Sequence, residues 1–268
     1  MASERRVIPL ESNPDIFNTL LFNLGLLPVL QFQDSYLITD PDLLAFAPNP
    51  IHGLILLFPL TQNYEDYRKT TDEHIPPSAN EDIENVKWFK QTIGNACGLY
   101  ALLHILGNLP RDFVINLLQL NDFLRQITDK SSVEDVSRLV ETLETEIKLD
   151  TNYGQQGQTS APSADEQINL HFILYVKAKD GHVYELDGRR KGPIDLGPLQ
   201  SNHLLDSNAV VDKLKFYMDN TDEENKYNFS IMALGPESMW KVIDVTYPQS
   251  TYLPETGILY DNTYNEKT

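Results

Sequence analysis

The feature that most constrains the fold is a continuous apolar run over residues 51–60, with the sequence IHGLILLFPL. Such a run is typical of a central strand covered on both faces, because a half-exposed strand would alternate polar with apolar residues. Helical patterns precede and follow it. Asn13 and Pro14 have the order of an N-cap and a first-turn proline, Gly25 is placed to end that helix, and residues 108–149 have mainly helical spacing. The chain is therefore expected to be an α/β protein.

Two neighbouring strands form the clearest local motif. Residues 170–176 and 182–186 are joined by Lys179-Asp180-Gly181, a strong hairpin turn signal. Periodicity and turn residues also predict strands over 31–38 and 227–234, helices over 40–46 and 206–219, a segment over 64–85 that is helical at its start, and a polar loop over 150–169. Strands at both ends with helices between them, and no internal repeat, indicate one α/β domain over residues 1–234 and a flexible tail over 235–268.

Composition limits the compartment. The chain has 268 residues, of which 41% are hydrophobic, enough for a substantial core. No stretch approaches the ~18 unbroken apolar residues of a membrane span, and residues 1–6 lack the apolar centre of a signal peptide. Cys97 is the single cysteine, so no intramolecular disulfide can form. We therefore expect a reducing compartment, the cytoplasm and also the nucleus.

Charge limits the partners. The net charge is −18, from 39 acidic and 21 basic residues. Without a stripe of Lys and Arg to neutralise phosphates, nucleic acid is not an expected partner, and a membrane is not expected either. An acidic surface favours a basic protein ligand, although solubility alone also explains it. We expect a monomer that needs no cofactor and no metal.

The stretch Gln91-Thr92-Ile93-Gly94-Asn95-Ala96-Cys97-Gly98 precedes a second apolar run. Asn95 is a suitable N-cap, the residues behind it have helical spacing, and Gly107 is placed to stop the helix. Cys97 would lie in the first turn, where free backbone N–H groups and the helix dipole favour a thiolate. The amide of Gln91 and the backbone N–H of Cys97 can stabilise an oxyanion. A buried cysteine without chemical function is the alternative.

A catalytic thiol needs a base and a group that orients the base. Among six histidines, His171 ends the polar loop and begins an apolar strand, where a side chain can reach a site. Hairpin pairing should return Asp187 to the start of that strand, where its carboxylate can hold the imidazole. His104 lies on the helical face of Cys97 but ~10.5 Å along the axis, too far for a hydrogen bond. From spacing alone, an unrelated placement of these residues stays open.

Three motifs occur in order along the chain: QTI-x-NACG at 91–98, NLHFI at 169–173 and GH-x-YELDGR at 181–189. The opening PLESNP at 9–14 and the apolar residues 54–59 accompany them. Together these segments resemble the ubiquitin C-terminal hydrolase family of papain-like cysteine peptidases, over about residues 7–234. The resemblance implies a single α/β/α papain-like domain with a central antiparallel sheet and a knotted backbone.

The resemblance also implies a reaction and a site. The reaction is hydrolysis of esters, thioesters, amides and short peptides at the C-terminal glycine of ubiquitin. Cys97 is implied as the nucleophile, His171 as general base and acid, Asp187 as its orienting group and Gln91 as oxyanion donor. The positions expected to bind substrate are Leu10, Glu11, Asp34, Asn95 and Asn169.

The polar loop over 150–169 aligns with the crossover loop of this family. With fixed ends, its ~20 residues have a contour near ~65 Å and form a ring at most ~20 Å across. Small or unfolded leaving groups are therefore expected to pass, whereas compact ubiquitin chains are not. A hydrolase of a ubiquitin-like modifier, a non-catalytic ubiquitin-binding adaptor and an ordinary papain-like endopeptidase remain alternatives.

Overall fold

The computed structural model describes residues 5–35, 47–75, 85–115, 118–128 and 130–237. The chain divides into two compact units, residues 1–237 and 238–268, and the described residues all belong to the first. The predicted helix over 40–46 lies outside the described residues, as does the predicted tail beyond residue 237.

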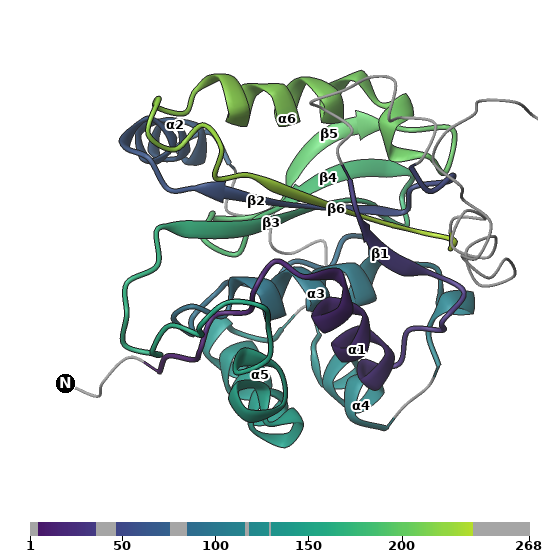
Figure 1. The fold of residues 1–268 in the computed structure, drawn as a ribbon. Helices are drawn as coiled ribbons and strands as arrows, with labels where there is room; N and C mark the ends of the chain where they lie inside the picture. The colour runs from purple at the N-terminus through teal and green to yellow at the C-terminus, as the bar shows by residue number, and fades with distance from the viewer. Residues whose placement is uncertain (1–4, 36–46, 76–84, 116–117, 129, 238–268) are drawn as a thin grey trace, which may run out of the picture. The chain divides into compact units, whose positions relative to one another are not determined.

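Within the described residues, a six-stranded sheet forms the centre of the domain (Figure 1). Its strands, in chain order, are β1 (Gln31–Asp34), β2 (Gly53–Pro59), β3 (Leu170–Lys177), β4 (His182–Leu186), β5 (Ile194–Pro198) and β6 (Ser230–Gly235). They lie in the spatial order β1-β6-β2-β3-β4-β5, and every neighbouring pair is antiparallel. The predicted central antiparallel sheet is confirmed. Strand β5 was not predicted, because this edge strand has no fully buried residue and contains a glycine and a proline.

Helices cover both faces of the sheet. They are α1 (Pro14–Leu24), α2 (Gln62–Asp72), α3 (Cys97–Asn108), α4 (Leu118–Gln126), α5 (Val133–Ile147) and α6 (Asn208–Asp219). The described residues also contain single turns of 3-10 helix at Arg111–Phe113 and Leu204–Asp206 and a π-helical turn at Asp150–Gly154. In Figure 1, α2 and α6 lie on one face, and α1, α3, α4 and α5 on the other. The expected α/β/α arrangement is confirmed, while the knot stays a prediction from the family.

Strand β2 explains the apolar run. It lies between β6 and β3, and its side chains alternate between two hydrophobic cores. Ile55 belongs to the core that contains Leu99 and Leu103 of α3, here called the α3-side core. Leu54, Leu56 and Phe58 belong to the core that contains Leu214 of α6, here called the α6-side core. Because both faces of β2 are covered, the strand from Gly53 to Pro59 contains no polar side chain.

Helix α1 begins and ends as predicted. The side chain of Asn13 accepts a hydrogen bond from the backbone N–H of Asp15, and Pro14 is the first helical residue. Gly25 ends the helix with a φ of 115°, in the left-handed region that glycine adopts without steric cost.

Helix α3 differs from the prediction at both ends. Ala96, and not Asn95, is the N-cap, because Asn95 has a φ of 61° and its amide bonds the polar loop instead. Gly107 does not end the helix, which continues through Asn108. A Cβ on Gly107 would lie 2.8 Å from the Cβ of Lys87, so this glycine permits close packing. Across the described ranges, no helix is both long and apolar enough to span a bilayer.

Candidate active site

Cys97 is the first residue of α3 and is 9% exposed. The apolar residues that follow it are buried in the α3-side core and fix the start of the helix, where backbone N–H groups are unpaired. Burial raises the pKa of the thiol, but the hydrogen bond and charge of His171, together with backbone N–H groups that include Gly98, lower it below its usual value. The neighbouring imidazole of His171 therefore favours ionisation of the Cys97 thiol.

His171 is the second residue of β3 and lies directly opposite Phe58 of β2. It is 2% exposed, and its Nε2 lies 2.7 Å from Oδ1 of Asp187. This contact leaves Nδ1 as the ring nitrogen available to Cys97. Burial lowers the pKa of His171, but the charge and hydrogen bond of Asp187, followed by those of Cys97, raise it to about 9.

Asp187 directly follows β4 and is fully buried. Its Oδ1 accepts from His171 and from the backbone N–H of Arg189 at 2.8 Å, and its Oδ2 accepts from the hydroxyl of Tyr64 at 2.6 Å. Burial raises the pKa of Asp187, but the charge of His171 and these hydrogen bonds hold it well below the usual range. The carboxylate is therefore ionised and can stabilise an imidazolium.

Gln91 is tied to the residue after Asp187. Its backbone N–H donates to the carbonyl of Gly188 at 2.8 Å, and a Cβ on Gly188 would lie 2.8 Å from the Cβ of Gln91. The side-chain Nε2 of Gln91 donates to the carbonyl of Ile93 at 3.1 Å. Because an amide nitrogen carries two hydrogens, one remains for a developing oxyanion.

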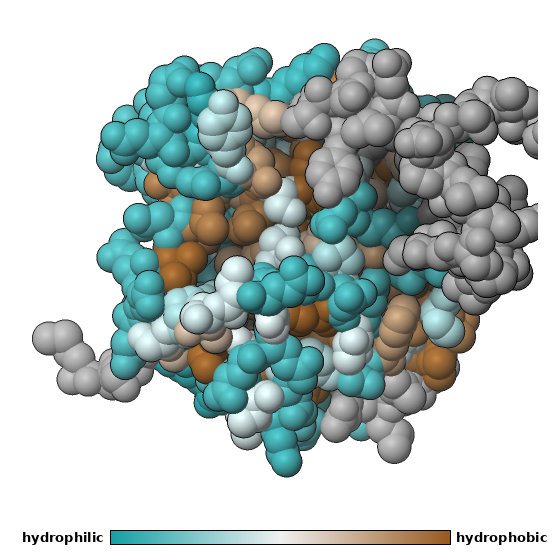
Figure 2. Space-filling model, viewed as in Figure 1, coloured by the Kyte–Doolittle hydropathy of each residue, from teal (hydrophilic) through white to brown (hydrophobic). Residues whose placement is uncertain are grey.

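A groove with a volume of about 350 Å³ lies beside Cys97. One part of its lining comes from the body of the domain, with Leu10, Leu57 and Phe172. The other part comes from the polar loop and includes Thr159. Figure 2 shows apolar residues at the left of the domain, framed by hydrophilic ones. A larger cavity of about 800 Å³, near Gly107 at the other end of α3, contains none of the predicted site residues.

The beginning and middle of the polar loop are held by the N-terminal segment. The backbone N–H of Ile8 donates to Oδ1 of Asp150 at 2.8 Å. The carboxylate of Glu11 accepts from the backbone N–H groups of Gln158 at 3.1 Å and Thr159 at 3.0 Å, and from the hydroxyl of Thr159. The hydrogen bond of this hydroxyl is the main cause that lowers the pKa of Glu11.

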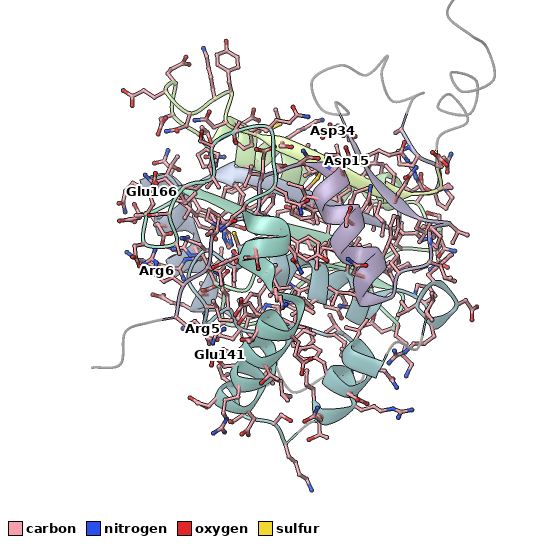
Figure 3. The ribbon with its side chains drawn as sticks, turned by 60° about the horizontal axis from the view of Figure 1, so that its bottom comes forward. Arg5, Arg6, Asp15, Asp34, Glu141 and Glu166 are labelled. Carbon is pink, nitrogen blue, oxygen red and sulfur yellow. The ribbon has the colours of Figure 1, made fainter. Side chains whose placement is uncertain are left out.

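The end of the loop is held by Arg6 and Asn95. Arg6 Nε donates to the carbonyl of Ala164 at 3.3 Å, and Asn95 Nδ2 donates to the same carbonyl at 2.9 Å and to that of Glu166 at 3.2 Å. Figure 3 shows Arg6 and Glu166 on the same side of the domain. The loop is thus fixed over the groove at both ends and in its middle.

The five predicted substrate positions do not all meet at the groove. Leu10 and Glu11 line it, and Glu11 at the same time bonds the loop. Asn95 bonds the loop but does not line the groove, and Asn169 contributes a backbone carbonyl that accepts from the N–H of Leu60 at 2.8 Å. Asp34 is exposed at the end of β1 and is not among the residues that line the groove.

His104 does not belong to the site. It is buried, and its Nε2 accepts from the backbone N–H of Phe89 at 2.9 Å. Burial lowers the pKa of His104 to about 4, so it is a neutral core residue. In the part of the chain that the structure describes, no group of three or more His, Cys, Asp or Glu side chains is arranged to hold a metal ion.

Two contacts of Asp187 were not predicted. Besides Tyr64, the indole N–H of Trp88 donates to the backbone carbonyl of Asp187 at 3.0 Å. Both residues are far from Asp187 in the sequence, and no spacing pattern links either of them to the hairpin. Only the tertiary arrangement reveals them.

A cysteine at the start of a helix, paired with a strand histidine and its buried carboxylate, defines a cysteine peptidase of the papain-like class. The model of the family described as ubiquitin carboxyl-terminal hydrolase, family 1, matches residues 7–219. The chain belongs to this family, as its motifs predicted.

Relatives and a solved structure agree. Ubiquitin carboxyl-terminal hydrolase YUH1 from Saccharomyces cerevisiae is 38% identical over 244 residues, which cover 88% of this chain and 99% of that protein. Isozyme L1 from Rattus norvegicus is 34% identical over 227 residues, 84% of this chain and 96% of that protein. The Trichinella spiralis UCH37 catalytic domain, solved bound to ubiquitin vinyl methyl ester, has a TM-score of 0.64 and 25% identity, and the match covers 88% of this chain and 99% of that one. The predicted class, a cysteine-type ubiquitin C-terminal hydrolase, is confirmed.

Proposed function

We propose that Cys97 of this deubiquitinating hydrolase cleaves esters, thioesters, amides and short peptides from the C-terminal glycine of ubiquitin. The observation that carries the proposal is the buried chain of contacts from Asp187 through His171 to Cys97, with 2.7 Å between the first two. A ubiquitin-binding adaptor without catalysis would not need an ionised carboxylate, an imidazole and a thiol in this order.

The proposal gives each group a role. The Cys97 thiolate attacks the carbonyl carbon, and the negative oxygen accepts hydrogen bonds from the Gln91 amide and the Cys97 backbone N–H. As the C–O, C–S or C–N bond breaks, His171 donates its Nδ1 proton to the leaving group. Water then attacks the thioester, His171 accepts a proton from this water, and the Cys97 thiolate departs.

Three observations support ubiquitin as the substrate. The groove has a volume of about 350 Å³ and a largely apolar lining, which suits a slender chain end that terminates in glycines. The net charge of −18 suits a ligand whose tail and binding face carry arginines and lysines. The solved UCH37 neighbour is bound to a ubiquitin derivative, which favours ubiquitin over a ubiquitin-like modifier. Glu11, which lines the groove, is the acidic residue proposed to meet the tail beside Cys97, whereas Asp34 is proposed to meet ubiquitin outside the groove.

The anchored loop supports a size limit on the leaving group. Its attachments to Ile8, Glu11 and Asn95 close a ring over the groove. We expect that replacing residues 159–163 by a much longer Gly/Ser insert allows cleavage of di-ubiquitin, measured by gel electrophoresis. Release of a small fluorophore from ubiquitin serves as the control and should persist. Unchanged selectivity in the insert variant would contradict this size limit.

The remaining expectations are part of the proposal. The enzyme acts as a monomer without cofactor, nucleic acid or membrane, in the cytoplasm and the nucleus. The acidic charge and the single cysteine support this proposal. Sedimentation and cell fractionation test it.

The decisive experiment compares the wild type with Cys97→Ala in the release of a fluorophore from the C-terminus of ubiquitin. We expect turnover to vanish in the variant while ubiquitin binding, measured by calorimetry, persists. Binding without turnover in the wild type would identify an adaptor instead. If neither occurs, matched probes built on ubiquitin-like modifiers test the alternative substrate class.

A further inference from the structure

Tyr64 of α2 contacts the catalytic carboxylate directly. Its hydroxyl donates to Oδ2 of Asp187 at 2.6 Å, and the residue is only 5% exposed. The ring stands edge-on to Phe58 at 4.8 Å between centroids, and Phe58 in turn lies 5.9 Å from the ring of His171. The hydroxyl therefore reaches the back of the His171–Asp187 pair from the α6-side core.

This hydrogen bond completes the coordination of the carboxylate. Oδ1 of Asp187 is occupied by His171 and by the backbone N–H of Arg189, whereas Oδ2 has Tyr64. A carboxylate held at both oxygens cannot rotate about its Cβ–Cγ bond without losing a bond. Burial and the charge of Asp187 raise the pKa of Tyr64 well above its usual value, so the hydroxyl keeps its proton and remains a donor.

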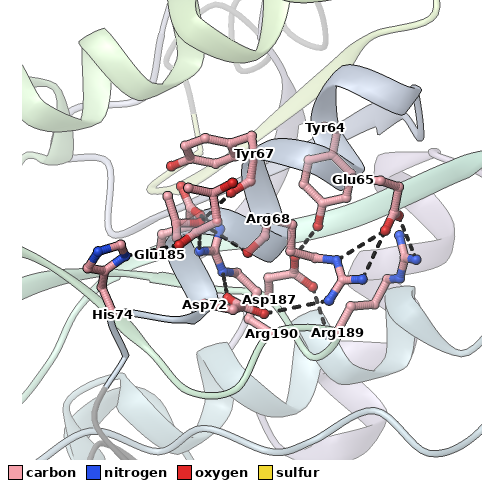
Figure 4. Close-up of polar contacts among 12 residues, drawn as sticks. Tyr64, Glu65, Tyr67, Arg68, Asp72, His74, Glu185, Asp187, Arg189 and Arg190 are labelled. Carbon is pink, nitrogen blue, oxygen red and sulfur yellow. Dashed lines mark hydrogen bonds and ion pairs between the residues drawn. The ribbon is translucent and has the colours of Figure 1, made fainter.

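Helix α2, which carries Tyr64, is fixed to the residues that directly follow Asp187. The hydroxyl of Thr61 accepts from the backbone N–H of Tyr64 at 3.3 Å, in the first turn of the helix. Further along, Asp72 forms a buried ion pair with Arg190 at 2.8 Å, and Glu65 pairs with Arg189 at 2.7 Å (Figure 4). These contacts hold α2 against the residues that follow Asp187, so the tyrosine hydroxyl is placed by a rigid element.

We propose that Tyr64 is a positioning residue of this hydrolase, whose hydroxyl fixes the Asp187 carboxylate and through it aligns His171 with Cys97. The inference rests on the proposed roles of these three residues. It predicts that the tyrosine acts on the state of the thiol even when no substrate is bound.

The test compares Tyr64→Phe with the matched control Tyr217→Phe. Tyr217 is also buried, lies 4.6 Å from the ring of Phe58, and donates its hydroxyl to the buried carboxylate of Glu185 at 3.0 Å. Both variants keep the ring and lose one hydroxyl from the same core. Thermal unfolding midpoints measure the structural cost of each change.

Two functional measurements follow. For fluorophore release from ubiquitin, we expect Tyr64→Phe to lower kcat about tenfold with KM unchanged, because partners behind a catalytic group contribute at this level. The second measurement is the rate at which neutral iodoacetamide alkylates Cys97, the only thiol of the chain, as a function of pH. In Tyr64→Phe, the rise of this rate with pH should move to higher pH. A less well held imidazole lowers the pKa of the thiol less. Tyr217→Phe should leave both measurements as in the wild type.

Several outcomes would overturn the proposal. Wild-type kcat and alkylation profiles in Tyr64→Phe would do so, and so would equal shifts in both variants, because these would indicate a general loosening of the core. Combined with Asp187→Asn, the change at Tyr64 should have no further effect; a persisting tenfold loss would mean that Tyr64 acts elsewhere. Alkylation needs no ubiquitin, so a wild type that does not cleave ubiquitin leaves this part of the test intact and instead refutes the proposed function.

Discussion

At the scale of single residues, the site is a set of buried groups that determine one another's ionisation. Asp187 is held ionised, and its charge raises the pKa of His171 to about 9 from 6.5. Linkage makes this a stability effect. Because the folded pKa of His171 lies above the unfolded one, its contribution is fully present below pH 6.5 and is lost as the pH rises through about 9.

The raised pKa of His171 also predicts how kcat depends on pH in the alkaline range. Below a pH of about 9, His171 carries the proton that the leaving group requires, and above it this proton is lost. We therefore expect kcat for fluorophore release to fall above pH 9. In Asp187→Asn, this fall of kcat should begin at lower pH, because the charge that raises the pKa of His171 is removed. A fall of kcat at the same pH in both proteins would contradict this assignment.

At the scale of elements, the sequence correctly predicted those features that neighbouring residues determine. The N-cap, first-turn proline and final glycine of α1 are local, and so is the turn of the β3–β4 hairpin that places Asp187 near His171. Asn95 and Gly107 were interpreted wrongly as helix signals, because tertiary contacts to the loop and to Lys87 determine their roles.

The same distinction applies to the site. The hairpin predicts that His171 and Asp187 lie close together, because both belong to it. Spacing alone left the place of Cys97 open, and only the resemblance to the family put it beside them. The substrate positions depend on the path of the loop, and the contact of Tyr64 depends on how α2 packs against the sheet. Neither the path of the loop nor the packing of α2 can be predicted from the spacing of residues along the chain.

The loop itself gives a prediction at this scale. Glu11 accepts hydrogen bonds from two backbone N–H groups and one hydroxyl of the loop, and a neutral amide accepts these less strongly. We expect Glu11→Gln to speed amide hydrogen exchange at Gln158 and Thr159. Glu166→Gln, a change at an exposed side chain of the same loop, is the control. Equal exchange rates in the wild type and Glu11→Gln would exclude the carboxylate as an anchor.

At the scale of the whole molecule, the net charge of −18 acts on every encounter with a basic partner. Salt screens such attraction, with a Debye length of about 10 Å at 0.1 M.

We therefore expect kcat/KM for ubiquitin to fall as salt is raised, mainly through the association rate. Alkylation of Cys97 by uncharged iodoacetamide should not change over the same range, which controls for effects on the site itself. A flat salt profile for ubiquitin would show that the charge serves solubility alone.

The two hydrophobic cores have a consequence for how the enzyme can fail. Cys97 belongs to the α3-side core, whereas the rings around His171, those of Phe58 and Tyr64, belong to the α6-side core. The proposed catalytic pair of Cys97 and His171 therefore depends on the packing of both cores. A slip of one layer past the other by about 1 Å is enough to cost ~100-fold in rate. A displacement of one layer relative to the other can thus abolish activity while every helix and strand stays folded.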